Sequence, residues 1–176
     1  MADIANPFEG TEGYNCFGCS LGNPIGLRLR FRDEGEAVSA AWEPRAEFAG
    51  FHGVLHGGIQ ATLHDEIASW YVFAKLGTAG FTADLTVRYL SPVYISKGAV
   101  RLVTTLLSND GRRAVMRTTL YDGGGTACSE SDVSYAIVPE HIARRKFYYP
   151  GKEAFVGGEH AAREPSNAQA KGKLGT

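Results

Sequence analysis

The sequence predicts a single α+β domain in which an antiparallel β-sheet curls around one long central helix. A segment near the middle of the chain is apolar on nearly every side at helical spacing, which is typical of an enclosed helix rather than a surface helix. Four strand-like segments follow it, with hairpin-type turns between them. A sheet wrapped around one helix satisfies both patterns, and 176 residues are enough for one such core.

An arm and two strands are predicted before the helix. Residues 1–20 contain turn residues without periodicity and form the arm. Leu27–Arg32 alternates apolar and basic residues, so its apolar side chains point to the core and its arginines point outward. Glu36–Trp42 is a second strand, and Arg45–Leu55, which contains two glycines, is a loop that permits close backbone approach.

The helix is predicted over Gly58–Lys75, and Gly77 provides its stop. Four strands follow: Phe81–Leu90, Ala99–Ser108, Arg112–Tyr121 and Ala127–Val138. Asn109–Gly111 and Asp122–Gly125 mark tight turns between them. Residues 21–150 therefore form the domain, and the composition beyond it predicts a disordered tail over residues 151–176.

Composition narrows the function classes. The formal net charge is −1 with both signs interspersed, which argues against nucleic acid or a membrane as the partner. The N-terminal residues lack the pattern of a secretory signal, and no apolar run is long enough to cross a bilayer, so we expect a cytoplasmic protein.

Three cysteines, Cys16, Cys19 and Cys128, do not suggest a disulfide framework. Cys16 and Cys19 have the CxxC spacing of zinc and redox sites, but such a zinc site needs two more ligands and there is no second pair. We therefore expect a structural turn at this position, no metal and no redox cofactor.

The start of the helix combines two glycines with an acid further along. Gly57 and Gly58 follow His56 and leave backbone N–H groups approachable at the positive end of the helix dipole. Such groups stabilise a developing oxyanion, and Asp65 adds a carboxylate within an otherwise mostly apolar helix. A carboxylate and an oxyanion site are the minimum set for attack on a carbonyl group.

The segment Gly50–Asp65, GFHGVLHGGIQATLHD, resembles the helix-start motif of hot-dog-fold acyl-CoA thioesterases, most closely of the phenylacetate-degradation (PaaI-type) branch. Four further segments extend the resemblance: Cys16–Cys19, Asn23–Leu27, Thr82–Leu85 and Tyr89–Pro92. The resemblance implies a hot-dog fold and hydrolysis of an acyl-CoA to a free acid and CoA. It implies no cofactor apart from the CoA of the substrate.

The same resemblance implies roles for particular residues. Asp65 is the catalytic carboxylate, acting as general base on water or as nucleophile. A backbone N–H at Gly57 or Gly58 polarises the thioester carbonyl, His56 shapes that pocket, and Thr82 places a hydroxyl close to the acid.

Further candidate substrate-binding residues are His52, Glu66, Arg88, Arg144 and Arg145. Glu66 departs from the family pattern because it directly follows Asp65, and some relatives use glutamate as the catalytic acid. The arginines suit CoA phosphates, although such residues are more often solvated surface charges. The sequence therefore allows these arginines to be either ligands of the CoA phosphates or solvated surface charges.

The spacing between the two reactive groups predicts a dimer. Gly58 and Asp65 lie about 10 Å apart along one helix at ~1.5 Å per residue, whereas both groups must lie about 3 Å from the reacting carbonyl. Two antiparallel helices from different chains satisfy this requirement. Val100–Leu107 also carries apolar residues on both faces, which a partner would cover. We expect a homodimer or a dimer of dimers, that is, a homotetramer.

Two other functions fit the same pattern. A non-catalytic module would bind acyl-CoA at the dimer seam without turnover. A hydratase or dehydratase would need an acid–base pair, and no histidine and carboxylate stand at a suitable spacing.

Overall fold

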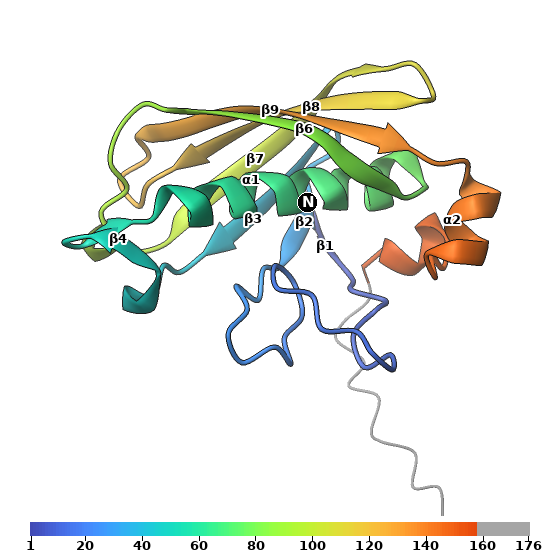
Figure 1. The fold of residues 1–176 in the computed structure, drawn as a ribbon, viewed down its shortest axis with the longest axis horizontal. Helices are drawn as coiled ribbons and strands as arrows, with labels where there is room; N and C mark the ends of the chain where they lie inside the picture. Colours follow the sequence, from blue (N-terminus) through green and yellow to red (C-terminus); the bar gives the residue numbers. More distant parts are fainter. Residues whose placement is uncertain (158–176) are drawn as a thin grey trace, which may run out of the picture.

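The computed structural model describes residues 1–157, which form one seven-stranded antiparallel sheet with a long helix against one face (Figure 1). In order across the sheet, the strands are β1 (Ala2–Ile4), β2 (Phe31–Asp33), β3 (Ala37–Trp42), β7 (Val100–Asn109), β8 (Arg113–Tyr121), β9 (Ala127–Ile137) and β6 (Gly80–Tyr89). The predicted fold class is therefore confirmed, and β6 is an edge strand. In the described part of the chain, no helix has the length and apolar character needed to cross a bilayer.

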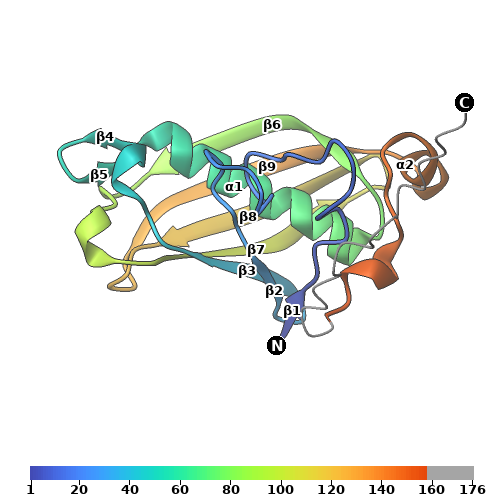
Figure 2. The same cartoon turned by 90° about the horizontal axis from the view of Figure 1, so that it is seen from below.

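The central helix α1 (Gly57–Tyr71) continues into a π-helical turn η2 (Val72–Leu76) and stops at Gly77, which has a left-handed φ of 71°. The sheet covers one side of α1, and the N-terminal arm crosses the opposite side (Figures 1 and 2). Trp70 is buried on this helix and stacks on Phe31, with ring centroids 4.4 Å apart. Because the helix is covered from both sides, it is apolar nearly all round.

The strands after the helix begin and end within one residue of their predicted limits. The two predicted tight turns join β7 to β8 and β8 to β9, and each uses a glycine with positive φ, at Gly111 and Gly125. Alternating burial along the strands places the core between the sheet and α1.

The first predicted strand is only partly formed. The predicted alternation of buried and exposed side chains is confirmed, because Leu27 and Leu29 are buried while Arg28 is exposed. However, Arg28 has a φ of 59°, which is incompatible with an extended strand. The N–H groups of Leu27 and Leu29 instead donate to the carbonyl groups of Phe17 and Gly18. The arm, not the sheet, therefore pairs with this segment.

Within the predicted arm, β1 forms a strand that pairs with β2, which was not predicted. The other elements that were not predicted are β4 (Ala49–Phe51), β5 (Val54–Leu55), α2 (Glu140–Lys146), η1 (Ala46–Phe48), η3 (Ile95–Lys97) and η4 (Lys152–Phe155). The last of these lies within the predicted tail, and its Phe155 is buried against Trp70. The rest of that tail, residues 158–176, lies outside the described residues.

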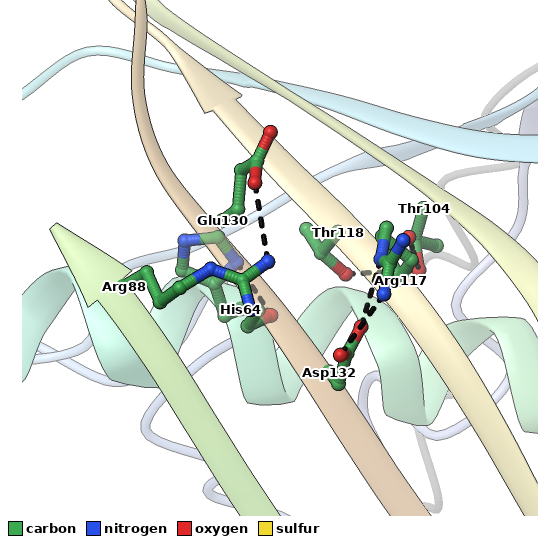
Figure 3. Close-up of polar contacts among 8 residues, drawn as sticks. His64, Arg88, Thr104, Arg117, Thr118, Glu130 and Asp132 are labelled. Atoms are coloured by element: carbon green, nitrogen blue, oxygen red, sulfur yellow. Dashed lines mark hydrogen bonds and ion pairs between the residues drawn. The ribbon is translucent and has the colours of Figure 1, made fainter. Parts of the chain in front are cut away.

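The two faces of the sheet differ in their polar contacts (Figure 3). Ion pairs join Arg88 to Glu130 and Arg117 to Asp132, and all four side chains are at least partly exposed on the face away from α1. On the face toward α1, the ring of His64 is fully buried. Its Nε2 lies 2.9 Å from Ser129 Oγ, and its Nδ1 lies 2.9 Å from Ser131 Oγ. Burial lowers the pKa of His64 to about 4, so the ring is neutral at pH 7.

Replacing His64 with leucine is expected to lower the free energy of unfolding by about 3 kcal/mol, because two buried serine hydroxyls lose their partner. Urea unfolding followed by circular dichroism measures this loss. Adding Ser129→Ala and Ser131→Ala to His64→Leu should recover part of the stability, since no hydroxyl is then left unpaired. A triple variant no more stable than the single variant would contradict this explanation.

Candidate active site

The carboxylate of Asp65 is held by two hydroxyl groups from the sheet. Thr82 Oγ1 donates to Asp65 Oδ1 at 2.6 Å, and the Tyr135 hydroxyl donates to the same oxygen at 3.0 Å. The Tyr135 hydroxyl also lies 3.1 Å from the backbone carbonyl of Asp65. Among residues 1–157, Asp65 Oδ2 has no hydrogen-bond partner, so one carboxylate oxygen is fixed and the other is available to a reactant.

The strand register explains how the two hydroxyl groups meet. Thr82 on β6 lies directly opposite Tyr135 on β9, so both side chains project from the same face of the sheet toward α1. Burial, and then the negative charge of Asp65, raise the pKa of Tyr135, which keeps its hydroxyl protonated as a donor. Tyr135 was not predicted as a site residue, since only the pairing of β6 with β9 brings it to the acid.

At the start of α1, only one of the two glycine N–H groups is available. His56 caps the helix, and its Nδ1 accepts the N–H of Gly58 at 2.8 Å. Because Nδ1 is the acceptor, the ring proton of the neutral imidazole lies on Nε2. The Gly57 N–H has no acceptor among the described residues. Of the two predicted oxyanion donors, Gly57 is therefore the one left unpaired.

Two neighbouring contacts shape this helix start. A Cβ atom at Gly50 would lie 2.8 Å from the His56 ring, so the glycine in the preceding loop permits the ring to pack closely. The Tyr89 hydroxyl, from the end of β6, donates to the Gly57 carbonyl at 2.7 Å. Gly57 therefore lies against the tyrosine ring of the edge strand.

Glu66 does not join Asp65, although the two residues are adjacent on α1. Successive helical side chains point about 100° apart, and Glu66 faces the N-terminal arm, where it contacts Cys16. Burial, and then the negative charge of Cys16, raise the pKa of Glu66 to about 7. The Cys19 thiol, and then the nearby backbone N–H groups, lower the pKa of Cys16 to about 6.

The other candidate substrate-binding residues lie apart from Asp65. His52 is exposed in the turn between β4 and β5, near the helix start. Arg88 pairs with Glu130 on the outer face of the sheet. Arg144 and Arg145 are exposed on α2, at the opposite end of the molecule from β4 (Figures 1 and 2).

Within one chain, the acid and the free amide are too far apart to act on one carbonyl group. Gly57 and Asp65 are eight positions apart on α1, which corresponds to about 12 Å along the axis. The structure therefore brings Asp65, Thr82 and Tyr135 into one group and leaves His56, Gly57 and Gly58 in a second group.

Residues 52–129, which are less than half of the chain, match the family described as the thioesterase superfamily. No curated protein sequence matches the chain. Among solved structures, thioesterase HI1161 from Haemophilus influenzae superposes with a TM-score of 0.57 at 20% identity, covering 64% of this chain and 79% of that one.

Two similar structures contain CoA compounds. The smu.793 protein from Streptococcus mutans, bound to acetyl CoA, has a TM-score of 0.61 at 14% identity and covers 75% of this chain and 98% of that one. The BH2602 protein from Bacillus halodurans, with CoA, has a TM-score of 0.59 at 20% identity and covers 70% of this chain and 81% of that one. At these identities, the likeness establishes a shared fold.

Proposed function

From the hot-dog fold that the chain shares with these proteins, we propose that it hydrolyses acyl-CoA thioesters to a free acid and CoA. The observation that carries this proposal is the Asp65 carboxylate, with one oxygen held by Thr82 and Tyr135 and the other free. The CoA compounds in two similar structures support the substrate class. The motif order described above supports a place near the PaaI-type branch.

In the proposed reaction, Asp65 Oδ2 takes a proton from water as the water oxygen attacks the thioester carbon. The negative charge that develops on the carbonyl oxygen is stabilised by the Gly57 N–H at the positive end of α1. Collapse of this intermediate breaks the carbon–sulfur bond, and the proton held by Asp65 passes to the CoA sulfur. If Asp65 attacks directly, the carbon–sulfur bond breaks and the CoA thiolate leaves as a mixed anhydride forms on Asp65. Water then hydrolyses the anhydride and supplies the proton that the thiolate takes up.

We propose that each site contains Asp65 of one protomer and Gly57 of its partner. The edge strand β6 supports this arrangement, because seven of its ten residues are exposed and none is buried. It carries Phe81 and Tyr89, which are 54% and 53% exposed. Long exposed edge strands with apolar side chains tend to pair with another chain. The dimer is the minimum active unit, and a dimer of dimers would contain the same sites.

Release of free thiol from a panel of acyl-CoA compounds tests the proposed activity. The panel should contain short aliphatic, long aliphatic and aromatic acyl groups, including phenylacetyl-CoA. We expect turnover of at least one class. Saturable binding of acyl-CoA without thiol release would favour the non-catalytic module, and hydration of an enoyl-CoA without thiol release would favour the hydratase.

Shared sites predict that two inactive variants restore each other. Asp65→Asn and Gly57→Pro each remove one half of a site, so a mixed dimer retains one intact site and one site that lacks both groups. An equimolar mixture of two freely exchanging variants should recover about a quarter of the wild-type activity. Mass spectrometry of the intact dimers verifies exchange, and no recovery despite exchange would contradict the shared site.

A further inference from the structure

The N-terminal arm crosses α1 on the side away from the sheet (Figure 2). Two thiols and a carboxylate meet between the arm and this helix. They belong to Cys16, Cys19 and Glu66, and one ligand atom from each residue lies within 4.8 Å of the others. Cys16 Sγ lies 3.5 Å from Glu66 Oε1 and 3.7 Å from Glu66 Oε2. None of these residues takes part in the proposed thioester chemistry.

Hydrogen bonds from neighbouring residues hold this cluster in place. Trp70 Nε1 donates to Glu66 Oε1 at 3.2 Å, and the Tyr14 hydroxyl lies 2.9 Å from Cys19 Sγ. Asn6 Nδ2 in turn donates to the Tyr14 hydroxyl at 3.0 Å. Outer contacts of this kind orient the ligands of metal sites.

The turn between the two cysteines closes directly onto the carboxylate. A Cβ atom at Gly18 would lie 2.3 Å from Glu66 Cδ, so only glycine allows the backbone to come this close. The Cys16 thiol and the Trp70 N–H, which contact the Glu66 carboxylate, carry no positive charge. On binding, the cation would displace the thiol protons of Cys16 and Cys19 to solvent and compensate the charge of the two thiolates and the carboxylate that become its ligands.

We propose that Cys16, Cys19 and Glu66 bind a thiophilic divalent cation, Zn²⁺ in the first instance, with a solvent molecule as the fourth ligand. Tetrahedral Zn²⁺ with Zn–S bonds of about 2.3 Å and Zn–O bonds of about 2.1 Å places sulfur and oxygen ligands roughly 3.5 Å apart. The Cys16–Glu66 separations agree with this value.

This site departs from the expectation of no metal, which was based on the lack of a second cysteine pair. The third ligand is a glutamate 50 residues after Cys16, which a search for cysteine pairs does not detect. The ion would join the arm to α1 at the residue that follows Asp65. The inference does not depend on the proposed thioesterase activity.

Zinc titration of the reduced, metal-depleted full-length chain against a chromophoric chelator tests the site. We expect one Zn²⁺ per chain, and an affinity lowered about 100-fold or more by Cys16→Ser or Cys19→Ser. Glu66→Gln keeps the shape of the side chain but removes its charge, and it should weaken binding at least about tenfold. Cys128→Ser is the matched control, since Cys128 is buried on β9 and contacts the Pro92 and Thr126 carbonyls instead.

Two further measurements do not depend on how well the variants fold. Co²⁺ added to the wild-type chain should give a thiolate-to-metal charge-transfer band, and removal of Zn²⁺ by a chelator should lower the Tm of the wild-type chain. Absence of stoichiometric Zn²⁺ binding by the reduced wild-type chain would overturn the site. Binding that Glu66→Gln leaves unchanged would overturn the assignment of Glu66 as a ligand.

Discussion

Asp65→Asn is expected to lower kcat for thioester hydrolysis by about 10³-fold while leaving the fold intact. The asparagine oxygen can accept the same hydrogen bonds from Thr82 and Tyr135, so the side chain keeps its position. The amide can neither take a proton from water nor attack the thioester carbon. Steady-state thiol release measures kcat, and circular dichroism with thermal unfolding verifies the fold.

Asp132→Asn is the control for this experiment. Asp132 is also a carboxylate, but it pairs with Arg117 on the outer face of the sheet, away from α1 (Figure 3). Partly exposed ion pairs of this kind contribute little to stability, so near-normal kcat is expected. If Asp65→Asn also retained near-normal kcat, Asp65 would have no part in the mechanism.

Gly57→Pro should lower kcat about 10²- to 10³-fold by removing one backbone N–H from the oxyanion site. Proline suits this position, because Gly57 is the first residue of α1 and proline is favoured there. His56 has φ −59° and ψ 134°, the extended conformation that a residue before proline adopts. The N–H that is lost has no acceptor within residues 1–157, so the substitution breaks no hydrogen bond in this part of the chain.

Gly57→Ala separates the effect of the missing N–H from that of the added carbon. Both variants place a Cβ about 3.3 Å from the Tyr89 ring, and only alanine keeps the N–H. The expected result is a small change in kcat for Gly57→Ala and a large one for Gly57→Pro. Equal kcat values in the two variants would mean that the Gly57 amide does not bind the oxyanion.

Much of the fold was predictable because local patterns and tertiary packing agree. Helix α1 is apolar on nearly every side because the sheet and the arm cover it. The two turns at Gly111 and Gly125 could be predicted because their backbone needs a positive φ, which favours glycine. The first strand was predicted too long for the opposite reason. The alternation of residue types predicts burial correctly. However, the backbone of Arg28 leaves the extended region, and its neighbours Leu27 and Leu29 pair with the arm.

The candidate site was predictable only where its residues are close in sequence or fit the family motif. His56, Gly57 and Gly58 are consecutive, yet the choice between the two glycine amides depends on the orientation of the His56 ring. Tyr135 approaches Asp65 from 70 residues away through strand pairing, and Glu66 meets Cys16 through the path of the arm. Register and chain path are long-range properties, which the spacing of residues along one sequence does not specify.

The edge strand β6 connects both halves of the proposed chemistry. Near its beginning, Thr82 holds the acid of its own subunit, and at its end Tyr89 holds the carbonyl of Gly57. Fraying or slippage of this strand would therefore displace the acid and the amide together. Dilution that separates the subunits should abolish turnover even though each chain keeps both of these contacts, because the acid and the amide of one site then lie on different molecules.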